Sequence, residues 1–289
     1  MRRLAVTTTP RKRTARAKAI APVVLKLGGE LLEDRVRLEG VARLVASAAK
    51  QQALVVVHGG GKDIDAALAQ AGIPKQQVDG LRITDEPTLQ VVIAVLAGSI
   101  NTRLVAAVNA AGGRAVGLTG ADAGVGWVRR AKPHRATNGE LVDLGFVGEP
   151  APNGDSSLIG ALTGRAFVPV IACIGAARDG SLFNVNADTL ASSLAARLGA
   201  RCLVFAGGTA GVLDAEGRTI PALDSAAIDD LVSSGTATAG MVAKLRAGRR
   251  AIDDGVGEVA IADGRQPKRL AALLAGTASR TGAWTRIHG

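Results

Sequence analysis

The stretch ALVVVHGGGKDIDAALAQAG (residues 53–72) decides the fold class, because it predicts a strand, a tight turn and a helix in direct succession. The apolar run before His58 is short and continuous, as in a strand that is buried on both faces. Three glycines follow, and from Ile64 to Ala71 apolar residues recur at the i, i+3, i+4, i+7 spacing of an amphipathic helix. Gly72 then ends the predicted helix as a C-cap.

The same pattern recurs along the chain. PVVLKLGGELL (residues 22–32) predicts another buried strand that runs into a glycine turn. Alternation of helices with continuously apolar strands indicates a mainly parallel sheet that is covered on both faces. The expected fold is therefore α/β, a three-layer αβα sandwich with a mainly parallel central sheet. Helices are expected at residues 38–50, 88–111, 156–164, 186–200, 225–234 and 240–254, strands at 113–120, 166–175, 201–208 and 256–262, and hairpin structure at 126–149.

The composition is that of a globular protein. Of the 289 residues 47% are hydrophobic, which argues against disorder, and only four Phe, two Trp and no Tyr are present. The core must therefore consist of Val, Leu, Ile and Ala. No uninterrupted apolar run approaches the roughly 20 residues that span a bilayer, so we expect no membrane segment and a cytoplasmic location.

The net charge of +10 is concentrated at the N-terminus. Residues 1–20 contain seven Arg or Lys and no acid, which leaves +3 for the other 269 residues. Such a tail can be a solvated extension, a nucleic-acid-binding arm or a transit peptide. Because neither aromatic residues nor Ser accompany the charges, we expect residues 1–21 to be a solvated extension and a nucleic-acid partner to be absent.

Two isolated cysteines, Cys173 and Cys202, lie in apolar, strand-like runs. Their positions give no CxxC spacing, so reduced thiols in the core are expected rather than a zinc site or any other metal site within the chain.

Two glycine turns are the first indication of chemistry. Gly28–Gly29 and Gly59–Gly61 each follow an apolar strand, where backbone N–H groups are free to face an anion. Neither turn matches the GxxxxGK[ST] or GxGxxG pattern. Each turn alone is also consistent with a simple tight connection. Lys26, two residues ahead of the first turn, makes phosphate binding the more specific interpretation.

Six motifs stand out along the chain: KLGG (26–29), VHGGG (57–61), DGLRIT (79–84), DLGFVGEP (143–150), FNVNAD (183–188) and GMVAK (240–244). Their order and spacing resemble the amino acid kinase superfamily, and within it the acetylglutamate kinase branch. The resemblance covers roughly residues 22–289, and GLRIT with NVNAD separates this branch from the aspartate, glutamate and uridylate kinases.

The resemblance implies that ATP, with Mg²⁺, phosphorylates the side-chain carboxylate of N-acetyl-L-glutamate, a step in arginine biosynthesis. Two alternatives stay open: a kinase for another N-acyl or carrier-bound glutamate or aminoadipate, and a regulatory relative with weakened catalysis. The resemblance also implies that residues 22–182 hold the acyl amino acid and residues 183–289 the nucleotide, with one sheet shared between the two lobes.

The resemblance implies a role for each motif residue. Lys26 and Lys244 would reach the transferred phosphoryl group from opposite sides, and Asp188 would hold both lysines. Solvated surface charges are the alternative for the lysines, and a carboxylate at a helix N-terminus is the alternative for Asp188. Arg82 would clamp the α-carboxylate of the acyl amino acid, unless it is an ordinary surface arginine. The remaining expected residues are Gly60, Gly61 and Asn184 for the acyl amino acid, Gly28, Gly29 and Gly59 for the phosphates, and His58 for orienting its glycine turn.

The chain departs from the family pattern at two places. Relatives carry an Asp after the strand at 202–205 where this chain has Gly208, which puts nucleotide binding in question; Asp214 is a candidate to compensate. The C-terminus LLAGTASRTGAWTRIHG lacks the EhFTxxGhGT-like segment (h, apolar) of arginine-inhibited relatives. We therefore expect an arginine-insensitive homodimer.

Overall fold

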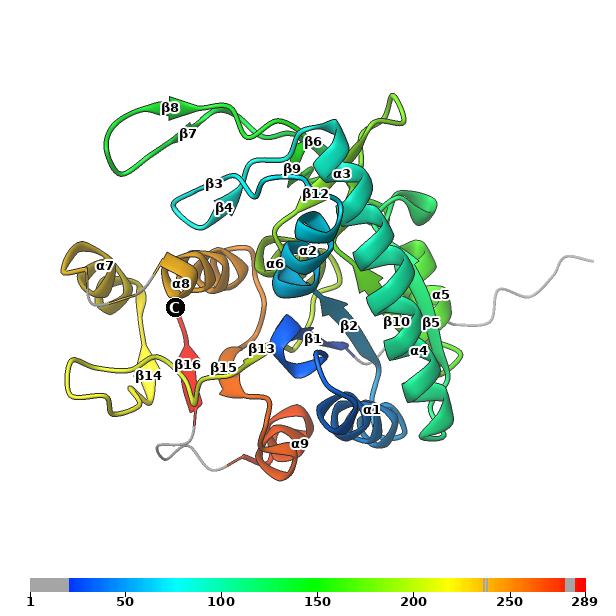
Figure 1. Cartoon of the computed structure of the whole chain (residues 1–289). Helices are drawn as coiled ribbons and strands as arrows, with labels where there is room; N and C mark the ends of the chain where they lie inside the picture. The colour runs from blue at the N-terminus through cyan, green and yellow to red at the C-terminus, as the bar shows by residue number, and fades with distance from the viewer. Residues whose placement is uncertain (1–20, 236, 238, 279–283) are drawn as a thin grey trace, which may run out of the picture.

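An eight-stranded sheet forms the centre of the protein. The computed structural model describes residues 21–235, 237, 239–278 and 284–289, so the extension expected at residues 1–21 lies outside the described residues except for Ala21. The sheet has the order β14–β16–β15–β13–β1–β2–β10–β5, and all neighbours pair in parallel except β15 and β16 (Figure 1). Its strands are β1 (Val23–Leu27), β2 (Leu54–His58), β5 (Ala115–Thr119), β10 (Val168–Ala172), β13 (Cys202–Gly207), β14 (Ala222–Leu223), β15 (Val259–Asp263) and β16 (Trp284–Ile287).

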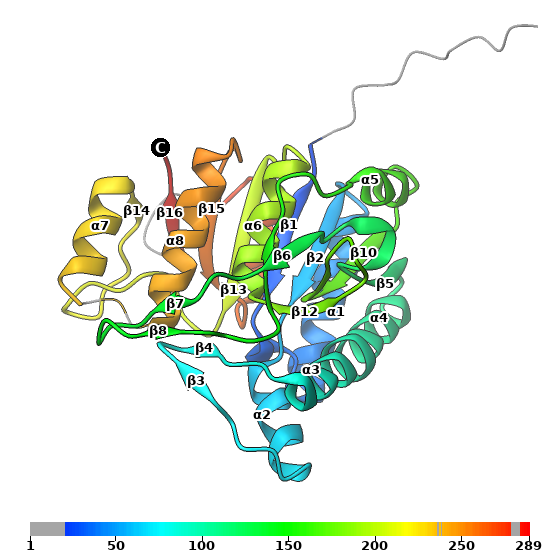
Figure 2. The same ribbon diagram turned by 90° about the horizontal axis from the view of Figure 1, so that it is seen from above.

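Helices cover both faces of this sheet, which confirms the expected three-layer arrangement. On one face α6 packs beside α8, and on the other α1 packs between α4 and α9 (Figures 1 and 2). Strands β1, β2, β10 and β15 are buried along their whole length, as continuous apolar runs predict. The helices are α1 (Arg35–Ala49), α2 (Gly61–Gln70), α3 (Glu86–Ile93), α4 (Asn101–Ala110), α5 (Ser157–Thr163), α6 (Ala187–Arg197), α7 (Ser225–Ser233), α8 (Ala239–Asp253) and α9 (Pro267–Ala275).

A second, four-stranded sheet was not expected from the sequence. It has the order β11–β12–β9–β6 and consists of β6 (Val128–Arg130), β9 (Val147–Pro150), β11 (Ile174–Ala176) and β12 (Leu182–Val185). The single strand expected at 166–175 is wrong in this respect, because the chain leaves the central sheet at Cys173. There the Cys173 thiol donates to the His58 carbonyl of β2, while the Cys173 carbonyl accepts from Val185 N–H of β12.

Two hairpins project next to each other on one side of the molecule (Figures 1 and 2). They are β3 (Gln77–Val78) with β4 (Leu81–Arg82), and β7 (His134–Arg135) with β8 (Leu141–Val142). Asp79 joins them: its carboxylate accepts hydrogen bonds from Thr137 Oγ1 and N–H at 2.5 and 3.0 Å and pairs with His134 Nε2 at 2.8 Å. The second hairpin lies inside the region expected to form hairpin structure.

The helix predicted at 88–111 forms a long apolar helix. It runs without a break from Glu86 to Ala110 through α3, the π-helical turns η2 (Ala94–Ile100) and α4, and the Asp85 carboxylate caps its start by accepting from Thr88 N–H. An 18-residue window of this helix has a mean hydropathy of 1.9, and one third of the window is buried. Judged by length and composition alone, the helix could cross a membrane. It does not contain an uninterrupted apolar run of membrane-spanning length, because Asn101, Thr102 and Arg103 interrupt its apolar residues.

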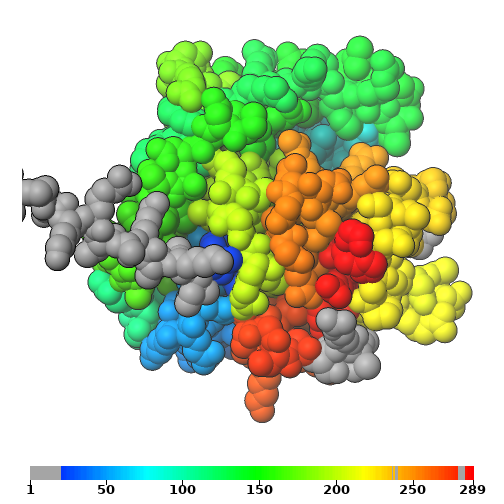
Figure 3. Space-filling model, turned by 180° about the vertical axis from the view of Figure 1, so that it is seen from behind, coloured from blue at the N-terminus to red at the C-terminus, as the bar shows by residue number. Residues whose placement is uncertain are grey.

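The C-terminal residues lie at the surface beside α8 and the segment around α7 (Figure 3). On this side of the sheet, strand β16 pairs with β15 and with the edge strand β14.

Candidate active site

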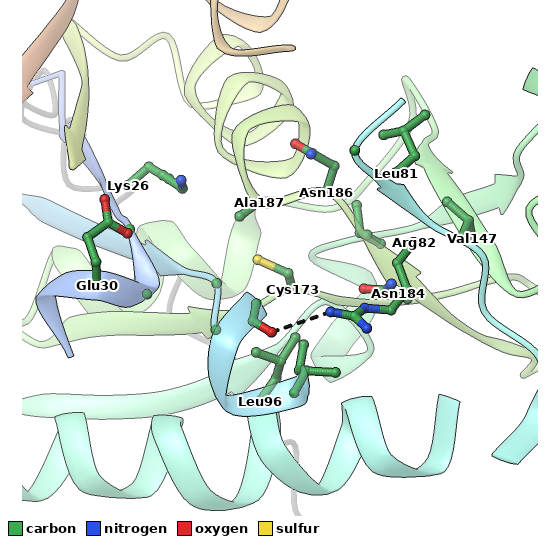
Figure 4. Close-up of a pocket in the computed structure, with 18 residues that line it drawn as sticks. Lys26, Glu30, Leu81, Arg82, Leu96, Val147, Cys173, Asn184, Asn186 and Ala187 are labelled. Atoms are coloured by element: carbon green, nitrogen blue, oxygen red, sulfur yellow. Dashed lines mark hydrogen bonds between the residues drawn. The ribbon is translucent and has the colours of Figure 1, made fainter. Parts of the chain in front are cut away.

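A cavity of about 280 Å³ lies at the C-terminal ends of β1 and β2 (Figure 4). Elements from both halves of the chain line it: the two glycine turns, β4, β12 and the start of α6. In open parallel sheets this edge is where ligands bind. Of the eleven residues predicted to act at the site, eight line this cavity, namely Lys26, Gly28, Gly29, Gly59, Gly60, Gly61, Arg82 and Asn184, whereas Asp188, Lys244 and His58 are not among its lining residues.

The two glycine turns touch each other because their strands are neighbours in register. Leu27 at the end of β1 pairs with His58 at the end of β2, so both turns leave the sheet at the same level. A β-carbon built on Gly29 would lie 3.2 Å from the Gly60 α-carbon, tighter than most real contacts. Glycine therefore allows the two backbones to approach closely enough to form one wall of the cavity.

Asp188 bridges the two lysines that the sequence singled out. Its Oδ1 lies 2.9 Å from Lys26 Nζ and its Oδ2 lies 3.0 Å from Lys244 Nζ. Lys26 comes from β1, Asp188 from the first turn of α6 and Lys244 from α8, and their side chains are 11%, 9% and 17% exposed. Neither lysine is a solvated surface charge. Asp188 occupies a helix N-terminus and holds an ion pair at the same time, so both of its expected environments are present.

The electrostatics of this cluster favour the ionised forms of Asp188 and Lys26 and work against the charge on Lys244. Burial disfavours the charged form of Asp188, but the two ammonium groups hold the pKa of its carboxyl below the usual range. Burial also opposes the charge on Lys26, yet the Asp188 carboxylate raises the pKa of that lysine. Burial and then the repulsion from Lys26 lower the pKa of Lys244. When all three groups are ionised, the cluster carries one net positive charge next to the cavity.

Arg82 reaches the cavity from β4 and has donor capacity to spare. Its Nη2 donates to Asp65 Oδ1 at 2.5 Å. The same nitrogen donates to the Gly61 carbonyl at 3.4 Å (Figure 4). Its Nη1 is buried and has no hydrogen-bond partner among the described residues. With a side chain that is 13% exposed, Arg82 is not an ordinary surface arginine. A buried, unpaired donor of this kind is costly unless a ligand takes it.

Asp65 was missed by the sequence analysis. It lies on α2, pairs with Arg82 and also accepts a hydrogen bond from Lys75 Nζ at 2.8 Å. Helical spacing places it on the polar side of α2, but only the fold brings that side against β4. Thr84 was likewise not predicted as a site residue. It is completely buried, and its Oγ1 accepts a hydrogen bond from Asn184 Nδ2 at 3.2 Å.

His58 is completely buried beneath the second glycine turn. Burial lowers the pKa of its imidazole to about 4, so the ring is neutral at pH 7. Asn101 Nδ2 donates to the Val170 carbonyl at 2.9 Å and lies 3.1 Å from His58 Nε2, which makes Nε2 the acceptor. The proton is then on Nδ1, which donates to the Gly59 carbonyl at 3.2 Å. This geometry supports the interpretation that His58 orients its turn.

At Gly208, where relatives carry an aspartate, the carboxylate of Glu30 from another part of the chain lies against the backbone. Glu30 Oε1 accepts a hydrogen bond from Gly208 N–H at 2.8 Å. The candidate for compensation, Asp214, is engaged elsewhere: its carboxylate accepts from Arg218 Nε at 2.8 Å and from the N–H groups of Glu216 and Arg218.

Among the described residues no group of three or more His, Cys, Asp or Glu is arranged to hold a metal ion. Cys173 lines the cavity, and burial raises the pKa of its thiol to about 12. It is therefore a protonated wall residue at neutral pH.

Comparison with known proteins places this geometry in a family. Residues 21–263 match the model of the amino acid kinase family. Two curated relatives are acetylglutamate kinases. The one from Acidiphilium cryptum is 39% identical over 94% of this chain and 92% of its own length, and the one from Sphingopyxis alaskensis is 41% identical over 92% and 88%.

Solved structures agree on the fold. The N-acetylglutamate synthase from Neisseria gonorrhoeae, complexed with coenzyme A and N-acetyl-glutamate, has a TM-score of 0.78 at 22% identity; the match covers 93% of this chain and 59% of that longer one. Carbamate kinase from Giardia lamblia bound to AMP-PNP has a TM-score of 0.65 at 16% identity, with 93% and 98% covered. On the family match, which spans most of the sequence, and on the relatives of about 40% identity, this chain belongs to the amino acid kinase family.

Proposed function

We propose that this chain is an ATP-dependent kinase that transfers the γ-phosphate of ATP to the side-chain carboxylate of N-acetyl-L-glutamate and forms N-acetylglutamyl phosphate, a step of arginine biosynthesis. The curated relatives named acetylglutamate kinase support it, since they are about 40% identical over almost the whole chain.

The arrangement of Lys26, Asp188 and Lys244 carries the proposal. A side-chain carboxylate is already ionised at neutral pH, so the reaction needs no general base. Catalysis then consists of holding the two reactants in line and of stabilising charge on the phosphoryl group. Two buried ammonium groups fixed by one carboxylate are suited to that task, because they are desolvated and already oriented.

Arg82 is the proposed anchor for the α-carboxylate of the acyl amino acid. Its buried Nη1 lacks a partner among the described residues, and a carboxylate in the cavity would satisfy it. Asp65 would fix the guanidinium from behind. Asn184 and the backbone of Gly60 and Gly61, which line the same cavity, would complete the subsite for the acyl amino acid.

The phosphates of ATP are assigned to Gly28, Gly29 and Gly59, next to Lys26. Residues 22–182 would hold the acyl amino acid and residues 183–289 most of the nucleotide, although the three phosphate-facing glycines belong to the first segment and Asn184 to the second. Mg²⁺ would arrive with the nucleotide and be held mainly by phosphate oxygens and water, a common arrangement for this ion. This fits the donor set, because the Asp188 carboxylate is occupied by two lysines.

We assign a cytoplasmic homodimer without arginine inhibition. The long apolar helix and the edge strand β5 border a groove of about 490 Å³ that small and apolar residues line together with three polar ones: Ala97, Val105, Ala106, Gly117 and Leu118 with Asn101, Thr102 and Asn109. A second copy of the chain is the proposed occupant, because the same patch on two subunits can face itself across a two-fold axis. This contact would also cover the apolar surface that otherwise resembles a membrane span.

A coupled ADP-release assay tests the reaction. We expect turnover that requires N-acetyl-L-glutamate and is much weaker with L-glutamate, which lacks the acyl group. A panel that includes other N-acyl glutamates and N-acyl aminoadipates tests the alternative substrates. Binding of ATP and N-acetyl-L-glutamate by calorimetry without any turnover would instead establish the regulatory alternative that Gly208 suggested.

A further inference from the structure

The carboxylate of Glu30 fills a space that three glycines leave open. Its Oε1 accepts from Gly208 N–H at 2.8 Å, and a β-carbon on Gly207 would lie 3.1 Å from that same oxygen. A β-carbon on Gly28 would overlap the carboxylate. Glu30 therefore lies between the loop after β1 and the loop after β13, which are neighbouring parallel strands.

The absence of a side chain at Gly208 leaves room for the Glu30 carboxylate. A β-carbon there would lie 3.6 Å from Glu30 Cγ and Oε1, so an aspartate would bring a second carboxylate against the first. With glycine at 208, the backbone N–H is open to an anion from outside the loop. The glycine at 208, which departs from the family pattern, therefore allows Glu30 to take its position.

The charges around Glu30 are those that a phosphate would use. Its carboxylate helps to raise the pKa of Arg265 and opposes the lowering of the pKa of Lys244. It also helps to raise the pKa of Lys26, which lies on the same side of the cavity (Figure 4). With both lysines protonated and Asp188 ionised, the Lys26–Asp188–Lys244 cluster has one surplus positive charge. Glu30 compensates that surplus while no nucleotide is bound.

The carboxylate is also held weakly enough to leave. Among the described residues, Gly208 N–H is the one hydrogen-bond partner of its oxygens, and no salt bridge fixes it. Glu30 is only half-buried, at the start of the short turn η1 (Gly29–Leu31), so its side chain can rotate towards solvent.

We propose that Glu30 is a displaceable stand-in for a nucleotide phosphate: its carboxylate occupies the anion position at Gly28 and Gly208 until ATP displaces it. The proposal rests on the proposed function, since it assigns this position to the phosphates of ATP. It makes Glu30 a residue that sets ATP affinity, because every binding event must break a charge-assisted hydrogen bond and move a negative charge away.

Calorimetric titration of Glu30→Gln with ATP tests the proposal. We expect ATP to bind about tenfold more tightly than to the unaltered chain, the size expected for losing one charge-assisted hydrogen bond. Glu30→Ala, which also removes the neutral acceptor, should bind ATP at least as tightly as Glu30→Gln. Adenosine, which has no phosphate, should bind the unaltered chain and both variants equally.

Glu33→Gln is the matched control. It also removes one negative charge, three residues away, but Glu33 pairs with Lys62 at 3.1 Å and is not part of the cavity lining. Its ATP affinity should stay within twofold of the unaltered chain. Melting temperatures establish that each variant is folded.

Unchanged or weaker ATP binding by folded Glu30→Gln and Glu30→Ala would overturn the proposal. An equal gain in Glu33→Gln would overturn it too, because the effect would then be general charge rather than displacement. If the unaltered chain does not bind ATP at all, the proposed function itself fails, which is a different result from equal ATP binding by all chains.

Discussion

Replacing Asp188 by Asn is the sharpest perturbation of the site, because it removes one charge and almost no volume. The carboxylate is the ion-pair partner of two lysines whose side chains are 11% and 17% exposed. Removing one member of a buried ion pair costs about 3–5 kcal/mol, because the remaining charge stays desolvated. In Asp188→Asn two ammonium groups lose their partner at once and also repel each other.

We therefore expect the free energy of unfolding to fall by about 3–5 kcal/mol and the melting temperature to fall by roughly 10 °C, given the scaling for a chain of this size. Turnover should fall by about 10²–10³-fold, because one lysine is displaced or loses its proton and no longer stabilises the phosphoryl group. Lowering the pH should recover part of the activity, since it restores the proton on that lysine.

Circular dichroism melting and a coupled ADP-release assay measure both effects. Asp229→Asn is the control: Asp229 pairs with Arg249 at 2.6 Å, but its side chain is 67% exposed, and such surface pairs contribute about 1 kcal/mol or less. The reasoning is refuted if Asp188→Asn melts and turns over like the Asp229→Asn variant.

Three further predictions follow from buried or exposed groups elsewhere. The pKa of His58 is about 4 in the folded chain and about 6.5 when unfolded. The free energy of unfolding should therefore decrease by roughly 3 kcal/mol as the pH falls from about 6.5 to about 4, which denaturant titration measures. In His58→Gln, whose side chain does not titrate, this part of the decrease should be absent. Arg82→Ala should raise the KM for N-acetyl-L-glutamate by about 10–100-fold, which is the effect of a lost charge-assisted hydrogen bond. Asp65→Asn should raise this KM less. An equal rise in the KM for ATP contradicts the assignment. Ala106→Glu should give a folded monomer in sedimentation analysis, because it puts a charge into the groove beside the long apolar helix, and an intact dimer excludes that interface.

The sequence was sufficient for six of the eight strands of the main sheet, because their runs are mainly apolar; the short strand β14 and the strand β16 were not predicted. Val23–Leu27 and Leu54–His58 are apolar except for Lys26 and His58 and are buried on both faces of a parallel sheet. The second sheet was not predictable in this way. The chain bends at Cys173 between two apolar segments that are both buried, so hydrophobicity does not change where the strand changes sheets.

The candidate site was predictable only as far as motif resemblance extends. Lys26, Asp188 and Lys244 are far apart in the sequence, and periodicity alone gives no reason to connect them. Asp65 and Glu30 carry no motif signal, since each matters through a contact made across the fold: one with Arg82 on β4, the other with the loop after β13. Contacts of this kind depend on how neighbouring loops lie next to each other, which local sequence does not encode.

Trapping the product with hydroxylamine tests the central claim most directly. Hydroxylamine converts an acyl phosphate into a hydroxamate, which reports where the γ-phosphate has gone. With ATP and N-acetyl-L-glutamate we predict one hydroxamate for each ADP, and about 10²–10³-fold slower formation in Lys26→Ala. ADP release without hydroxamate, or an undiminished rate in Lys26→Ala, would contradict transfer to a carboxylate through this pair of lysines.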